Sequence, residues 1–330
     1  SGGSASSIGA STNAAGNLVF NGGTLSYGAT GTLPVVLNTG TPSVSIDRLF
    51  TLAGNGTIAS DGFFGNIYLT TAVANNAALV FSNTGSVAFA GTGTRTLTLQ
   101  GASTGDNEMG VLLVNNGTST LSVTKAGTGQ WLLSNTNTYT GATTISGGTL
   151  QAVDGVGLPN TSSSGGGSNL TITGTATSPG SIFQTSGVFN RTLGTGQGQV
   201  QFTGASGFAG FAAVGSSLTV NLGGAAAGVT WNSGSFVPNG VALTFGSPTA
   251  TGDVTFVNPI NLNGAARTIA LNQNTTTGNN QGLVYATISG QISGSGGLVI
   301  QNLNNTGTGQ LYLTGNNNYS GTTTDRKSTR

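Results

Sequence analysis

Cysteine and histidine are both absent from this chain of 330 residues, and only 5% of its residues are charged. The lack of cysteine excludes a disulfide framework. The lack of both residues excludes cysteine nucleophiles, histidine-based catalytic triads, haem ligation and the common zinc sites. The net charge is +1, without the clustered Lys and Arg that nucleic-acid binding requires. We therefore expect no cofactor and no nucleic-acid partner.

Long apolar runs are also missing. No stretch approaches the roughly 18 apolar residues of a membrane-spanning helix, so we expect no membrane insertion by this segment. The start, Ser1-Gly2-Gly3-Ser4, has neither the basic nor the apolar region of a signal peptide, which suggests that the chain begins inside a longer protein. The apolar residues stand in short groups such as 18–20 and 111–114. These groups are too short for helices of about 10–12 residues, and their composition favours strands.

Glycine, in contrast, is abundant, with 58 of the 330 residues against a usual share of about 7%. Glycine-rich chains are often disordered, but disorder goes with low hydrophobicity and high net charge. Here 36% of the residues are hydrophobic and the charge is nearly balanced. The composition therefore predicts a folded all-β protein with a thin core and many glycine turns.

One stretch of the sequence occurs twice. Residues 127–150 read GTGQWLLSNTNTYTGATTISGGTL and residues 307–324 read GTGQLYLTGNNNYSGTTT, with 10 identities in 18 aligned positions. An internal repeat at a fixed offset is typical of architectures built from stacked repeats. Three short strands joined by Gly and Asn corners make about one coil, so the repeat predicts a β-solenoid.

Alternation within the repeat assigns its side chains to two faces of a strand. The predicted inward-facing repeat core consists of Trp131, Leu133, Ile145, Leu150, Leu311 and Leu313. We expect Gln130, Ser134 and Gln310 to face solvent. The predicted repeat corners are Tyr139 and Gly141, with Tyr319 and Gly321 in the second copy. We interpret each tyrosine as a ring packed over a corner, in preference to an exposed ring that stacks on a ligand.

The first copy resembles a known repeat through Trp-Leu-Leu-Ser-Asn-x-Asn-x-Tyr-Thr-Gly and the following Thr-Thr-Ile-Ser-Gly-Gly-Thr-Leu-Gln. It is similar to the autotransporter-associated β-strand repeat, the passenger-associated repeat of large secreted bacterial surface proteins. The resemblance implies a right-handed parallel β-helix passenger that is secreted or attached to the bacterial cell surface. It also implies a C-terminal outer-membrane barrel that is missing from this stretch of sequence.

The positions of the two copies predict the organisation of the chain. We expect a frayed initial segment at 1–16, a β-solenoid segment at 17–153 ending in the first repeat (127–150), and another at 170–324 ending in the second repeat (307–324). The Ser/Gly-rich stretch 154–169 between them is predicted to be a corner loop or a linker.

The last six residues break the repeat pattern. Residues 325–330 read DRKSTR where the first copy has ISGGTL. A charged end cap is one interpretation, because terminal repeats need polar outer faces. A back-translation of this hexapeptide resembles a sequencing adapter, so we favour the interpretation that 325–330 is a tail outside the family and a sequencing artefact. We expect it to be exposed and to form no coil of its own.

Candidate chemistry is scarce. Asp106 and Glu108 are close in sequence and fall on one face by alternation, which makes them a weak calcium candidate beside the simpler interpretation of a solvated corner loop. Thr-x-Thr strings such as 94–98 and 171–173 resemble ice-binding β-helical faces. Their irregular spacing favours threonine as an ordinary strand former.

We interpret the chain as a structural, non-catalytic stalk or scaffold segment of a secreted or cell-surface β-solenoid protein, with surface glycans or other cells as candidate partners of an adhesin. The alternative is a carbohydrate-active or carbohydrate-binding β-helix of lyase or glycosidase type, and an ice-binding β-solenoid is more remote. Glycoside hydrolysis needs two carboxylates at one bond, whereas the acids of this chain are scattered in sequence.

Overall fold

A computed structural model describes residues 3–4, 8–28, 43–62, 77–161, 166–274, 285–303 and 309–326. The chain divides into two compact units: unit 1 contains Ser1–Thr143 and Leu150–Ser168, and unit 2 contains Thr144–Thr149 and Asn169–Arg330. Parts of the predicted segments 1–16, 154–169 and 325–330, and the first two residues of the second repeat, lie outside the described residues.

Almost all regular structure in the described residues is strand. The helical part described is one 3-10 turn, η1 (Ala15–Asn17). In the same part of the chain no helix has the length and apolar character needed to cross a bilayer. The all-β prediction is therefore confirmed.

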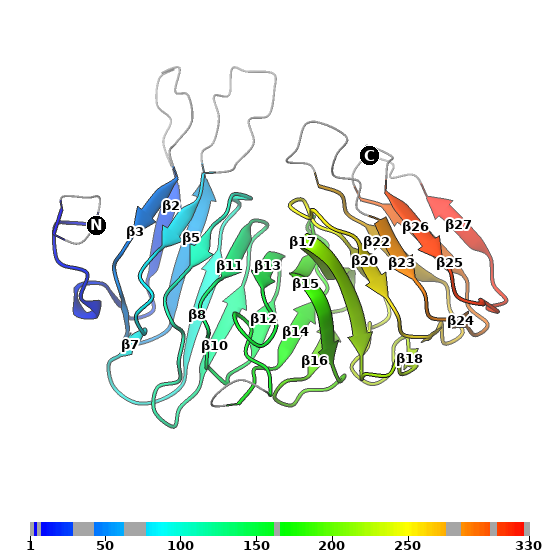
Figure 1. Ribbon diagram of the computed structural model, residues 1–330, viewed down its shortest axis with the longest axis horizontal. Coiled ribbons are helices and arrows are strands. Elements are labelled where there is room, and N and C mark those ends of the chain that lie inside the picture. Colours follow the sequence, from blue (N-terminus) through cyan, green and yellow to red (C-terminus); the bar gives the residue numbers. More distant parts are fainter. Residues whose placement is uncertain are drawn as a thin grey trace, which may run out of the picture. The chain divides into compact units, whose positions relative to one another are not determined.

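Unit 1 consists of short strands that enter three sheets in rotation (Figure 1). The strands are β1 (Val19–Phe20), β2 (Thr24–Gly28), β3 (Val44–Ile46), β4 (Thr51–Leu52), β5 (Gly56–Gly62), β6 (Leu79–Phe81), β7 (Ala88–Phe89), β8 (Arg95–Gln100), β9 (Glu108–Met109), β10 (Leu121–Lys125) and β11 (Gln130–Leu133). Two more strands, β12 (Thr143–Ile145) and β13 (Gly148–Ala152), fall at the division between the units.

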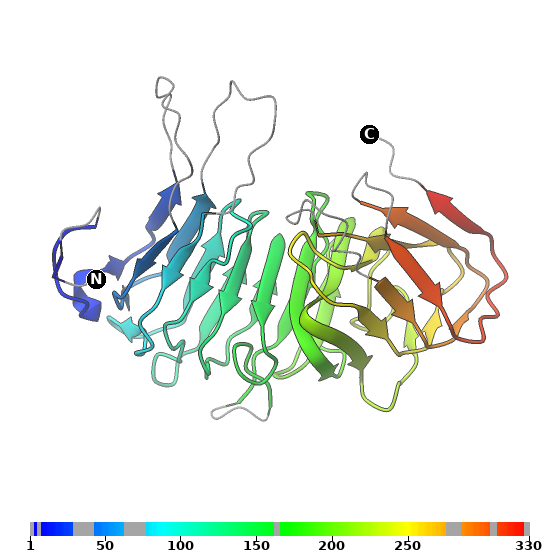
Figure 2. The ribbon, with the colours of Figure 1, turned by 45° about the horizontal axis from the view of Figure 1, so that its top comes forward.

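The rotation among sheets makes each set of three strands one coil. The sheet orders in unit 1 are β1-β4-β7, β2-β5-β8-β10 and β3-β6-β9-β11, and the pairings between these strands are parallel. Figures 1 and 2 show β2, β5, β8 and β10 side by side in sequence order. The parallel β-solenoid expected from the repeat is confirmed.

Unit 2 continues the same construction with some longer strands. They are β14 (Leu170–Thr173), β15 (Ser181–Arg191), β16 (Val200–Thr203), β17 (Gly207–Leu222), β18 (Val229–Thr230), β19 (Val241–Phe245), β20 (Val254–Phe256), β21 (Ile260–Asn261), β22 (Arg267–Leu271), β23 (Tyr285–Ile288), β24 (Ile292–Ser293), β25 (Leu298–Asn302), β26 (Gln310–Leu313) and β27 (Thr323–Arg326).

The main sheet of unit 2 branches at β17. The first part of β17 pairs in parallel with β19, and its last part pairs in parallel with β20. One branch continues as β19-β22-β25-β27 and the other as β20-β23-β26. A strand of 16 residues can carry two neighbours because each needs only three to five of its residues.

The core is a set of side-chain columns, since parallel register places equivalent residues above one another. Leu25, Ile58 and Leu99 are aligned in unit 1, and the next position in the same column is Lys125. In unit 2 the register aligns Phe183, Phe211 and Phe245. Large aromatic side chains are fully buried in both units, which supplies most of the apolar contact in a narrow coil.

The predicted tail is exposed where it is described. Asp325 and Arg326 are the last two residues of β27, and they pair with Ile300 and Gln301. All four residues of β27 are exposed. Residues 327–330 lie outside the described residues.

Candidate functional site

The first repeat fills its coil with apolar side chains. Trp131 and Leu133 in β11 are each 1% exposed, and Ile145 and Leu150 are fully buried. The indole Nε1–H of Trp131 donates to the carbonyl oxygen of Gln100 over 2.9 Å. The large ring is therefore buried without leaving its one polar group unpaired.

The prediction that Gln130 faces solvent is wrong, because its side chain is only 3% exposed. Its Nε2 donates to Oε1 of Gln151 at 3.2 Å. The outward side of β11 is thus covered at this point by another amide side chain, which satisfies the polar group that alternation would send to water. Ser134 is exposed, as expected, and its hydroxyl donates to Glu108.

The second repeat is arranged in the same way but is less covered. Leu311 and Leu313 align with Ala286 and Ile288 of β23, which are fully buried. Leu311 and Leu313 themselves are half-buried, while Gln310 is exposed. Among the described residues no strand pairs with the other edge of β26, which accounts for the greater exposure.

Both repeat corners contain a tyrosine bonded to a threonine four residues later. The Tyr139 hydroxyl lies 2.7 Å from Thr143 Oγ1, and the Tyr319 hydroxyl lies 2.5 Å from Thr323 Oγ1. Tyr139 is fully buried and Tyr319 is half-buried. In the first copy the chain of bonds continues to Ser168, whose hydroxyl lies 2.8 Å from Thr143 Oγ1.

Gly141 and Gly321 lie where the backbones of successive coils approach each other closely. A Cβ at Gly141 would lie 2.3 Å from the carbonyl oxygen of Leu121, and one at Gly321 would lie 2.5 Å from the backbone of Gly296. No real Cβ tolerates such distances to backbone atoms. Glycine is therefore required by the neighbouring coil, in addition to any requirement of the turn.

A second inter-coil contact was missed by sequence reasoning. Asn137 and Asn317 are identical in the two copies, and each accepts a backbone hydrogen bond from an earlier coil. Leu113 N–H donates to Asn137 Oδ1 at 2.9 Å, and Ile292 N–H donates to Asn317 Oδ1 at 2.8 Å. The identity of the two asparagines was the available signal, but it indicated a turn and gave no partner.

The acidic pair does not assemble a metal centre in the described part of the chain. Asp106 is exposed and Glu108 is half-buried, and Glu108 accepts a hydrogen bond from Ser134. Among the described residues no three acidic side chains come together. The weak calcium candidate therefore gains no third acidic ligand among the described residues.

Threonines align in one outer column of unit 1. Thr24, Thr57 and Thr98 are successive register partners, followed by Thr124. Beside it, Thr96 and Ser122 are register partners in a second, shorter hydroxyl column. The spacing is thus more regular than the sequence indicated, but a paired array extends over only two of these strands.

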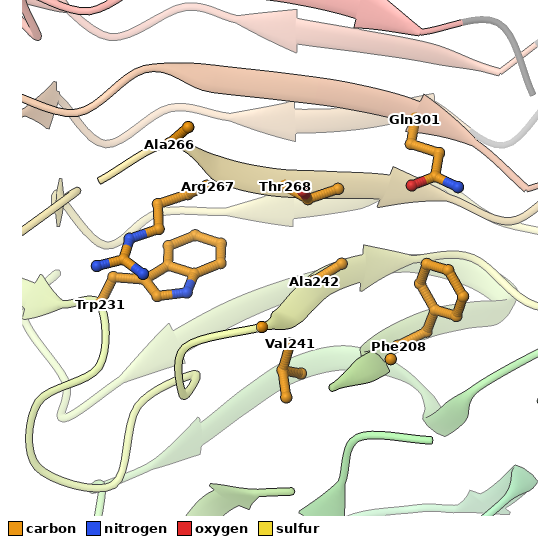
Figure 3. A pocket seen from close by; sticks show the side chains of 10 residues that line it. Phe208, Trp231, Val241, Ala242, Ala266, Arg267, Thr268 and Gln301 are labelled. Carbon is orange, nitrogen blue, oxygen red and sulfur yellow. The ribbon is translucent and has the colours of Figure 1, made fainter. Parts of the chain in front are cut away.

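A pocket of about 200 Å³ lies in unit 2 beside the starts of β19 and β22 (Figure 3). Its lining includes the buried side chains of Trp231 and Arg267 and the half-buried Gln301. The Arg267 guanidinium stands 5.9 Å from the Trp231 ring centroid. Arg267 stands apart from the other basic residues in the sequence, and no sequence pattern indicated this pocket.

Comparison with known protein families gives matches at the two repeats. A profile of the passenger-associated-transport-repeat family matches residues 123–152 and 303–324. The chain is also 38% identical over 157 residues to the Adhesin BmaC autotransporter of Brucella suis biovar 1 (strain 1330), which is 47% of this chain and 4% of that protein. No solved structure matches the chain significantly.

The parallel coils and the two repeat matches together support an autotransporter passenger repeat protein. This chain carries two passenger-associated transport repeats and is part of the secreted or cell-surface class of bacterial proteins to which autotransporter adhesins belong.

Proposed function

We propose that this chain is a non-catalytic stalk or scaffold segment of an adhesin that is secreted or displayed on the bacterial cell surface. The observation that carries the proposal is the ordered parallel pairing of successive coils within each unit. Each added coil lengthens such a stack by one strand spacing of about 4.8 Å. The stack needs no chemistry beyond backbone pairing and a narrow apolar core.

A lack of catalysis is supported by the placement of the ionisable groups. The described residues bring no three acidic side chains together, and the chain contains no histidine or cysteine. The similarity to an adhesin points in the same direction. Surface glycans or other cells are the proposed partners of the complete protein.

The test combines surface display with an assay for turnover. The chain carries an N-terminal epitope and is fused to an outer-membrane anchor, and intact cells are treated with a broad-specificity protease. We expect the epitope to survive, because buried coils are poor protease substrates. A Trp131→Ala variant, which empties a buried position, serves as the control and should lose the epitope faster.

The same displayed cells are incubated with neutral and acidic polysaccharides. The proposal predicts no release of reducing ends or unsaturated products above cells that carry the anchor alone. Product release that depends on the chain would overturn the non-catalytic assignment. Rapid loss of the wild-type epitope would contradict the stalk role.

A further inference from the structure

The pocket beside Arg267 arises from a gap between two strands. β19 pairs with β17 from Val241 onward, and β22 pairs with β25 from Arg267 onward. The pairing of β19 with β22 begins only at Leu243 and Ile269. Val241 and Arg267 therefore face each other across an unpaired interval, and the pocket opens there.

The floor and rim of the pocket differ in exposure. Trp231, Val241 and Arg267 are at least 95% buried and form part of the floor. Ala266 and Gly240 are exposed and stand at the rim. The volume of about 200 Å³ equals the share of about six or seven water molecules in the liquid, at roughly 30 Å³ each. A group about the size of one ring fits.

The guanidinium of Arg267 has more donors than acceptors around it. Its Nε donates to the carbonyl oxygen of Leu262 at 2.8 Å, Nη1 to Oδ1 of Asn239, and Nη2 to the carbonyl oxygen of Asn263 at 3.3 Å. A guanidinium has five N–H donors, so two have no acceptor among the described residues. All three acceptors are neutral, and no described carboxylate pairs with this charge.

Trp231 adds another donor. The side chain is 1% exposed, and its indole Nε1–H makes no hydrogen bond to a described residue, unlike that of Trp131. This nitrogen is not among the fully buried polar atoms that lack a partner, so it is not sealed off from the pocket. Figure 3 shows Trp231 and Arg267 at one end of the pocket, with the indole nitrogen on the side of Val241. Buried tyrosine and tryptophan polar groups usually find a partner.

We propose that this pocket binds a small carboxylate ligand, held by Arg267 and the Trp231 indole N–H. A carboxylate accepts hydrogen bonds without donating any, which matches a site that offers unused donors. Charge-assisted bonds from arginine to a carboxylate are stronger than neutral ones. Burial lowers the pKa of Arg267, but arginine stays charged in proteins, so the ligand's negative charge offsets the cost of the buried cation.

The half-buried Thr268 and Gln301 lie on the pocket wall away from Trp231 (Figure 3). Their hydroxyl and amide groups can meet polar substituents on the ligand body. A sugar acid and a peptide carboxyl terminus share the carboxylate, so the test must separate these sources. The proposal goes beyond the stalk role and does not depend on it, since a structural segment can hold a ligand without turning it over.

The experiment follows the indole N–H signals of the ¹⁵N-labelled full chain. The sequence has two tryptophans, so a Trp231→Phe variant assigns both signals. D-glucuronate, N-acetylalanine and acetate are titrated separately, with D-glucose and N-acetylalanine amide as neutral counterparts. A ligand of this size binds with a Kd on the order of 1 mM, so titration extends above that range.

We expect the Trp231 signal to shift with at least one carboxylate and not with its neutral counterpart, while the Trp131 signal stays in place. The carboxylate that binds most tightly identifies the source. Equal shifts with neutral and charged probes would overturn the proposal, as would no saturable shift with any carboxylate. A shift shared by both tryptophans would also count against it, because it would show a general effect.

Two variants test the assignment of residues. Ala266→Phe places a ring at an exposed rim position and should abolish the shift, while Ala265→Phe, at the exposed neighbour outside the pocket lining, should leave binding unchanged. Arg267→Gln should weaken binding at least tenfold. If Arg267→Gln fails to fold, the Ala266→Phe and Ala265→Phe pair still decides: equal binding by both variants would overturn the site.

Discussion

Lys125 places a positive charge in an apolar column of unit 1. Its side chain is fully buried, below Ile58 and Leu99 in the register, and Nζ donates to the carbonyl oxygens of Ala126 and Gly127 at 2.7 and 3.2 Å. Burial lowers the pKa of Lys125 to about 7. These two carbonyl oxygens carry no full negative charge to oppose the loss of water.

We predict that Lys125→Met removes a rise in stability with pH. The unfolded lysine has a pKa of about 10.4 and the folded one has a lower value, so the unfolded chain binds more protons between about pH 7 and pH 10. Stability must therefore increase with pH across that range and reach its lowest level below pH 7. The difference is roughly 4 kcal/mol, at 1.36 kcal/mol per pKa unit.

The measurement is the free energy of unfolding by denaturant at pH 6, 8 and 10 for both proteins. The six tyrosines titrate in both, so their contribution cancels in the difference. We expect Lys125→Met to be more stable at pH 6 and the two proteins to converge at pH 10. Parallel pH profiles would show that Lys125 keeps an ordinary pKa in the folded state, as a solvated lysine does.

The two corner tyrosines provide a matched pair. Tyr139→Phe removes a buried hydrogen bond to Thr143 and should lower the unfolding free energy by about 0.5–1.5 kcal/mol. Tyr319→Phe removes the same bond at a half-buried corner, where the bond itself is exposed and water can replace it, and should change stability by less than about 0.5 kcal/mol. Thermal melts of both variants decide this. Equal losses of unfolding free energy in the two variants would mean that burial does not determine how much this hydrogen bond contributes to stability.

At the residue scale, alternation predicts faces but not partners. Period-two alternation separates Trp131 and Leu133 from Leu132, which is half-buried. The same rule puts Lys125 on the inward face of Leu-Ser-Val-Thr-Lys, but its charge argues for the opposite face, and sequence alone cannot decide between them. The solvent-facing prediction for Gln130 was wrong because the side chain that covers it, Gln151, lies 21 residues further along the chain.

At the scale of the element, the tight stacking of coils determines which residues fit at the corners. We predict that Gly141→Ala lowers the unfolding free energy by about 2–4 kcal/mol, the range for overpacking and backbone displacement together. The cause is the 2.3 Å approach of the added Cβ to the Leu121 carbonyl oxygen. Chemical denaturation measures the change.

Gly23→Ala is the control for this prediction. A Cβ at Gly23 would meet no atom within 4 Å, and the residue does not need a positive φ. The substitution should therefore be neutral or slightly stabilising, because alanine restricts the unfolded chain. A loss at Gly23 as large as that at Gly141 would contradict the stacking argument.

The sequence was sufficient to predict that the elements are short parallel strands, but not to predict which strands pair with one another. Short β-rich groups, glycine corners and the repeat led to parallel coils because few other folds use that pattern. The branch at β17 and the delayed pairing of β19 with β22 could not be derived. Both depend on how residues far apart in sequence align in space, so the pocket they create had no local signal.

At the scale of the whole molecule, stability in each unit should vary along the stack. In a solenoid each coil contacts mainly its neighbours, so stability is close to a sum of coil and interface contributions. In unit 2, β19 and β22 each pair on both sides, whereas β26 and β27 pair on one side within the described residues. An end strand has one ladder of hydrogen bonds fewer and a less covered apolar face.

We therefore predict graded amide hydrogen exchange within unit 2. Amides of β19 and β22, around the fully buried Leu243 and Ile269, should exchange at least about tenfold more slowly than those of β26 and β27, because end strands open locally at a smaller free-energy cost. Native-state exchange read by mass spectrometry of peptides from each strand measures the difference. Low denaturant should speed exchange first at β27 and β26, then in strands further inward. Uniform protection across these strands would contradict the gradient, because it would mean that the unit opens in one cooperative step whose free energy does not depend on position in the stack.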